Sequence, residues 1–151
     1  APLRNAIAQG SQISFTAYSL SPFFLNREVF SDIAGSTVSN LTSNVNYPHR
    51  PDIEGYVSSF EGPNNFANVY GSRLFGLLVP PETGNYIFYI AADDQAELWL
   101  STDETRAARR LICREPTLAS APRNWTGTVN RPGSENISAP VSLVAGRRAE
   151  Q

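Results

Sequence analysis

The sequence lacks lysine and methionine entirely, and it has one cysteine and one histidine among its 151 residues. A single cysteine excludes an intrachain disulfide. His49 and Cys113 lie far apart in the chain, so they do not form the cluster of ligands that a zinc site requires. We therefore expect neither a disulfide-stabilised fold nor zinc chemistry.

Long hydrophobic runs are also missing. Apolar stretches such as 77–79 are far shorter than the roughly 20 residues of a membrane-spanning helix, so no membrane insertion is expected. The formal net charge is −2, and all twelve basic residues are arginine, without a sustained basic stripe. This balance disfavours a nucleic-acid partner. The arginines between Arg106 and Arg114 are flanked by acidic residues, which predicts a solvated mixed-charge loop.

Alternating polar and apolar residues predict several short strands. The clearest pattern runs from 73 to 101, where three segments are separated by Pro80-Pro81-Glu82-Thr83-Gly84 and by Asp93-Asp94-Gln95. The expected strands are 12–20, 73–79, 85–91, 96–101, 110–114 and 137–144. Residues 27–41 fit short strands or turns around Gly35 better than a capped helix. Strands at this spacing predict an all-β sandwich or barrel.

Enzymatic motifs are scarce. No glycine-rich phosphate loop and no Gly-x-Ser-x-Gly elbow occurs, and His49 has no visible catalytic partner. Four glutamates (Glu54, Glu61, Glu82 and Glu97) could meet in space, but nothing in the sequence singles out a pair for glycoside hydrolysis. An enzyme is therefore the least favoured class of function.

Asp93 and Asp94 form the strongest candidate for a metal site, with Gln95 beside them in a turn between two strands. Calcium binds six to eight oxygen atoms, which loop carboxylates and backbone carbonyls supply. Aspartate is equally an ordinary turn residue whose side chain bonds its own backbone. The residues alone leave both interpretations open.

Trp99 and Trp125 are the candidates for stacking against a sugar ring, because each indole offers a flat apolar face beside polar neighbours. Packing against the sheet explains Trp99 at least as well as contact with a sugar, and packing within a loop is the favoured interpretation of Trp125. The three Asn-x-Ser/Thr sequons, at Asn40, Asn124 and Asn136, are about as many as chance would place in a chain of this composition.

Several motifs in order resemble the PA-14 domain family. The motifs are Phe60-Glu61-Gly62-Pro63-Asn64, Tyr70-Gly71-Ser72-Arg73-Leu74, the stretch from Pro80 to Phe88, and the stretch from Ala92 to Ser101. With its flanks the resemblance covers residues 27–148. It implies an antiparallel, jelly-roll-like β-sandwich that serves as an accessory module in glycosidases, adhesins and toxins, often as a glycan binder.

In the yeast adhesin branch of that family, two successive aspartates joined by a cis peptide hold a calcium ion that ligates sugar hydroxyls. Asp93 and Asp94 occupy the matching turn, so the resemblance implies Ca²⁺ as cofactor. Family members continue beyond the position of Arg148, and this chain is expected to lack the C-terminal closing strands. The expected organisation is a lead at 1–26, the sandwich at 27–148 and a tail at 149–151.

The resulting prediction is a non-catalytic, calcium-binding carbohydrate-binding module of a secreted or cell-surface protein, within a larger multidomain chain. Its partner is a glycan, with neither nucleic acid nor membrane insertion. The predicted binding residues are Asp93, Asp94, Gln95, Trp99 and Trp125, of which the two aspartates bind the metal. The alternative is a structural or protein-interaction module without a ligand of its own.

Overall fold

The computed structural model describes residues 24–101, 103, 105–116, 121–126 and 133–150. Its regular structure is almost entirely β-strand, and its paired strands are antiparallel. The all-β fold class is therefore confirmed. The strand expected at 12–20 lies outside the described residues.

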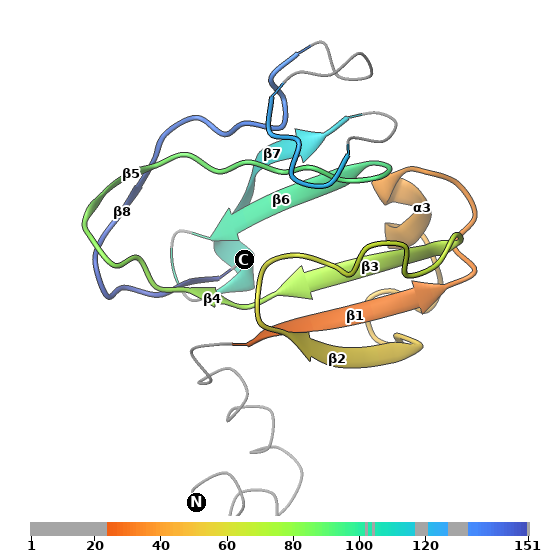
Figure 1. Cartoon of the computed structure of the whole chain (residues 1–151). Coiled ribbons are helices and arrows are strands. Elements are labelled where there is room, and N and C mark those ends of the chain that lie inside the picture. Colours follow the sequence, from red (N-terminus) through yellow and green to blue (C-terminus); the bar gives the residue numbers. More distant parts are fainter. Residues whose placement is uncertain (1–23, 102, 104, 117–120, 127–132, 151) are drawn as a thin grey trace, which may run out of the picture.

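A three-stranded sheet has the order β2-β1-β3 (Figure 1). Strand β1 (Leu25–Ser31) is its central strand, and β2 (Ile53–Val57) and β3 (Tyr70–Phe75) flank it. Val29 and Phe30 of β1 are almost fully buried. Because successive side chains of a strand point to opposite faces, both faces of the sheet are covered at this point. The first two residues of β1 fall within the stretch that the sequence assigned to a lead.

Three two-stranded units complete the fold (Figure 1). The pairs are β4 (Leu77–Leu78) with β9 (Ala149–Glu150), β5 (Gly84–Tyr86) with β8 (Val141–Leu143), and β6 (Ala96–Ser101) with β7 (Arg109–Glu115). The short 3-10 helix η1 (Arg106–Ala108) leads into β7. Leu100, Leu143 and Ala149 form a buried cluster between these units. The core therefore joins segments that are far apart in the sequence.

Strand β6 has the bounds that its sequence predicts, and its alternation holds as far as Leu100, after which Ser101 is fully buried on the face predicted to be exposed. Leu98 and Leu100 are buried, whereas Glu97 and Trp99 face solvent. The pairing with β7 shifts register between Leu98, opposite Cys113, and Trp99, opposite Leu111, so Ile112 is the extra residue at this irregularity. The expected strand at 85–91 is shorter, since regular pairing ends at Tyr86.

Two local predictions were wrong. The segment around Gly35 leads into a helix, α3 (Val38–Thr42), because Thr37 and Asn40 form a reciprocal capping box that stabilises its first turn. The loop expected across the arginine-rich segment was wrong from Arg109 onward, where the chain forms β7 and confirms the strand expected at 110–114. The side chains at 109, 110 and 114 are nevertheless solvent-exposed, as the charge pattern predicted. No helix in the described ranges has the length and apolar character needed to cross a bilayer.

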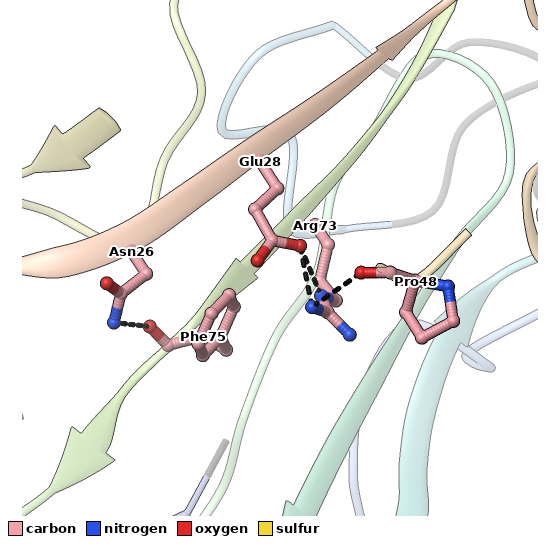
Figure 2. Close-up of polar contacts among 5 residues, drawn as sticks. All are labelled: Asn26, Glu28, Pro48, Arg73 and Phe75. Carbon is pink, nitrogen blue, oxygen red and sulfur yellow. Dashed lines mark hydrogen bonds and ion pairs between the residues drawn. The ribbon is translucent and has the colours of Figure 1, made fainter. Parts of the chain in front are cut away.

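An ion pair links the neighbouring strands β1 and β3 (Figure 2). Nη2 of Arg73 lies 2.6 Å from Oε2 of Glu28, and both side chains are less than one-fifth exposed. The same guanidinium donates to the carbonyl of Pro48 at 3.5 Å and lies over the ring of Phe75. This pair reinforces the pairing of β1 with β3 on one face of the sheet.

Candidate functional site

The turn between Tyr86 and β6 carries the candidate metal ligands. The peptide bond between Asp93 and Asp94 is cis. Asp93 is exposed and Asp94 is partly buried. The backbone N–H of Gln95 donates to the carbonyl of Ser36 over 3.2 Å, which ties the end of the turn to the loop before α3. The two carboxylates are therefore carried by a turn that is anchored at its C-terminal side.

Asn136 anchors the other side of this turn. Its side chain is 1% exposed, and its amide nitrogen donates to the carbonyls of Ile90 at 3.2 Å and Trp125 at 3.1 Å. The backbone carbonyl of Asn136 accepts a hydrogen bond from the backbone N–H of Ile90 at 3.0 Å. One buried side chain thus connects the segment that leads into the aspartate turn with the loop that carries Trp125.

Among the residues that the structure describes, the amide oxygen of Asn136 is a buried acceptor without a hydrogen-bond partner. Exchanging the amide oxygen and nitrogen would place an oxygen against two carbonyl oxygens, so the hydrogen bonds fix the orientation of the group. A buried oxygen without a donor costs free energy unless something else satisfies it. A bound cation is one such partner.

Carboxylate and amide oxygens are the kind of ligand that a hard cation such as Ca²⁺ takes. The described residues contain no group of three or more His, Cys, Asp or Glu side chains that could hold a metal. The carboxylates of Asp93 and Asp94 would therefore need neutral oxygens beside them, and the amide oxygen of Asn136 is of that type. Sequence reasoning missed Asn136, which it considered only as a sequon.

Gln95 is engaged within the fold rather than free. Its side-chain nitrogen donates to the carbonyl of Pro116 over 2.8 Å. A cavity of about 120 Å³ lies beside it, lined by Val38, Gln95, Ala96, Glu97, Arg114, Glu115 and Pro116. This hydrogen bond ties the aspartate turn to the end of β7, and the role of Gln95 in binding a ligand stays a prediction.

The two tryptophans lie in different surroundings. The ring of Trp125 meets the ring of Tyr89 edge to face, with centroids 6.5 Å apart and an interplanar angle of 61°. Trp99 lies on the outer side of β6, where its indole N–H donates to Glu97 over 2.9 Å. In the described part of the chain, no hydrogen bond or ring contact joins Trp99 to Trp125. The fold therefore links Trp125, but not Trp99, to the aspartate turn through Asn136.

The other groups considered for chemistry occupy structural positions. Burial raises the pKa of the Cys113 thiol to about 11, so it is protonated at neutral pH and a poor nucleophile. His49 is exposed in a loop. Glu61 forms an ion pair with Arg123, which lies two residues before Trp125.

Comparison with known proteins supplies the last finding on this site. The family model described as PA14 domain matches residues 52–148, a range that contains the aspartate turn, both tryptophans and Asn136. A mouse (Mus musculus) protein, N-acetyl-beta-glucosaminyl-glycoprotein 4-beta-N-acetylgalactosaminyltransferase 1, is 34% identical over 129 residues. That alignment covers 82% of this chain but only 12% of the mouse protein. No solved structure gives a significant match.

Proposed function

The chain belongs to the PA14 domain family, and from this premise we propose that it is a non-catalytic, calcium-dependent carbohydrate-binding module. A PA14 domain is a carbohydrate-binding or interaction module, and such domains typically occur in extracellular proteins. The proposal therefore places the module in a secreted or cell-surface protein, as one part of a larger chain. The proposal adds the calcium ion, the glycan ligand and the absence of catalysis, which membership of the family does not specify.

One observation carries the proposal. The buried amide oxygen of Asn136 has no hydrogen-bond donor within the described ranges, although the same side chain is held by Ile90, three residues before Asp93. The carboxylates of Asp93 and Asp94 and this oxygen are the groups that would hold the ion. A bound Ca²⁺ supplies further coordination positions that sugar hydroxyls can fill. The chain's own contribution is to fix both ends of the turn, through Asn136 and Gln95.

The relative suggests the kind of glycan. Its name describes a transferase that acts on N-acetyl-β-glucosaminyl glycoproteins, and this chain corresponds to a small part of it. We therefore propose glycans that end in β-linked N-acetylglucosamine as the ligand. In this assignment the module binds the sugar that another part of a longer chain modifies.

Calcium binding is tested by thermal unfolding of the chain in CaCl₂ and in EGTA. A ligand at a hundredfold excess over its Kd stabilises the folded state by about 2.7 kcal/mol, which raises Tm by about 5–10 °C in a domain of this size. The Asp93→Asn/Asp94→Asn double variant should lose this rise. Glu54→Gln, which changes an exposed carboxyl on β2, is the matched control and should keep it.

Glycan binding is tested separately by calorimetry with N,N′-diacetylchitobiose in CaCl₂ and in EGTA, with lactose as the comparison sugar. We expect heat of binding for diacetylchitobiose in calcium alone. A wild-type chain with the same Tm in both buffers and no binding to any glycan on an array would contradict the proposal. That outcome would favour the alternative, a structural or protein-interaction module in which Asp93 and Asp94 form only a turn.

A further inference from the structure

Two exposed aromatic rings are in contact, and one of them, Tyr89, lies on the segment that leads into the aspartate turn. Tyr89 is 47% exposed and Trp125 is 43% exposed, and their rings meet at 61° with centroids 6.5 Å apart. Two partly exposed aromatic rings in contact present flat apolar faces with polar tips, which is the kind of surface that a sugar ring can stack on. Tyr89 was not among the residues that the sequence indicated.

Backbone contacts hold the residues that carry both rings in place. Tyr89 forms an antiparallel bridge with Ile137, and Asn136 beside it donates to the carbonyl of Trp125. The loop before Trp125 is fixed a second time, because Arg123 donates to both carboxylate oxygens of Glu61, at distances between 2.7 and 3.3 Å. The pair is thus preorganised, which lowers the entropic cost of binding a ligand.

The rings carry the chemistry that a pyranose requires. Two faces at 61° form a corner in which one ring can stack on the C–H face of a sugar while the other contacts its edge. In the described part of the chain, the Tyr89 hydroxyl and the Trp125 indole N–H have no hydrogen-bond partner, so both polar tips are available to sugar hydroxyls. The indole N–H of Trp99 is already bonded to Glu97.

The spacing relates the corner to the aspartate turn. Tyr89 precedes Asp93 by four residues, so their Cα atoms are separated by at most about 14 Å. An oligosaccharide whose terminal sugar binds at the turn can therefore extend over the corner. We infer that Tyr89 and Trp125 form a stacking subsite for the second sugar unit of the glycan, and that Trp99 takes no part in it. This inference rests on the proposed function.

Fluorescence provides the first test, because the chain has only two tryptophans. Trp99→Phe leaves Trp125 as the sole reporter, and Trp125→Phe leaves Trp99. We expect N,N′-diacetylchitobiose in CaCl₂ to change the emission of the Trp99→Phe chain and to leave that of the Trp125→Phe chain unchanged. A response from Trp99 alone would overturn the inference.

Calorimetry provides the second test, with N-acetylglucosamine and N,N′-diacetylchitobiose as ligands. Tyr89→Ala should weaken the affinity for the disaccharide by about tenfold or more, while changing the affinity for the monosaccharide by less than about twofold. Tyr89→Phe should keep the preference for the disaccharide. Tyr56→Ala, at an equally exposed tyrosine on β2, is the matched control and should bind both sugars as the wild type does.

The outcomes separate the two proposals. If the wild type binds the disaccharide and both Tyr89→Ala and Trp125→Phe bind it with the same affinity, the stacking subsite is overturned. The proposed function is then unaffected. A wild-type chain that binds neither sugar would overturn both. Thermal unfolding of each variant verifies that it is folded, and Tyr89→Phe provides the comparison if Tyr89→Ala has a lowered Tm.

Discussion

The side-chain amide of Asn136 donates to the carbonyl of Trp125 over 3.1 Å, across eleven residues of sequence. The same amide donates to Ile90, which leads into the aspartate turn. A single buried side chain therefore sets the position of the candidate metal ligands and of one candidate sugar contact. Loss of this residue should affect both.

Asn136→Ala should lower the free energy of unfolding by about 1–3 kcal/mol, because it leaves two carbonyls without their donor. It should also remove the rise in Tm on addition of calcium, since an oxygen is lost from the candidate ligand set. Chemical unfolding with and without CaCl₂ measures both effects. Asn85→Ala, at an exposed position of β5, is the control that should change neither.

Glu28→Gln should destabilise the fold by about 2–4 kcal/mol, because it leaves Arg73 without its ionic partner in a largely buried position. Arg73→Lys should also be destabilising, since an ammonium group cannot reproduce the planar contacts over Phe75. Urea unfolding measures the difference. A cost below about 0.5 kcal/mol for both variants would show that the pair contributes little.

The exposed pair of Glu61 and Arg123 should behave differently. Hydrogen bonds from Arg123 lower the pKa of Glu61 below its usual value of 4.5. A carboxyl whose pKa is lowered in the folded state stabilises it above the unfolded pKa, and this contribution is lost as the pH falls through the folded pKa.

We therefore expect the loop that carries Trp125 to loosen below about pH 4.5 and at high salt. Emission of Trp125 in the Trp99→Phe chain, followed from pH 6 to pH 3, reports this change. The same titration with an added Glu61→Gln substitution should lack the transition. An identical transition in both chains would assign it to another group.

Cys113 should resist alkylation by iodoacetamide at pH 8 in the folded chain and react readily in guanidinium chloride. The reason is that burial raises its pKa from 9.0 to about 11. The pKa of Cys113 is higher in the folded state than in the unfolded state, so its ionisation does not affect the free energy of unfolding below about pH 9. As the pH rises from about 9 to 11, the unfolded state ionises first and the free energy of unfolding falls. Comparison with Cys113→Ala isolates the contribution, since that variant should lose less stability over this range.

Strand β6 could be predicted from the sequence. Alternation over Ala96–Ser101 predicted the bounds of β6 and its buried face, because side chains of a strand point to opposite faces in turn. The helix α3 could not be predicted in this way. Its cap uses Asn40 in place of the usual Glu or Gln, so the local signal was weak.

The aspartate turn was also visible in the sequence, since two adjacent carboxylates between strands are a local feature. The contribution of Asn136 was not, because its contacts reach Ile90 across 46 residues and Trp125 across eleven. In the sequence it is one asparagine among many. Burial and an oxygen without a donor, both tertiary properties, distinguish it.

The sequence by itself determined the all-β class, the family and the place of the paired aspartates, since each depends on neighbouring residues and their order. Only the tertiary structure decided which aromatic residues accompany that turn. It brought Tyr89 against Trp125 and left Trp99 bonded to Glu97 on the outer side of β6. The physical reason is that alternation within a strand specifies which face a side chain takes, whereas contacts between segments distant in sequence specify what it meets there.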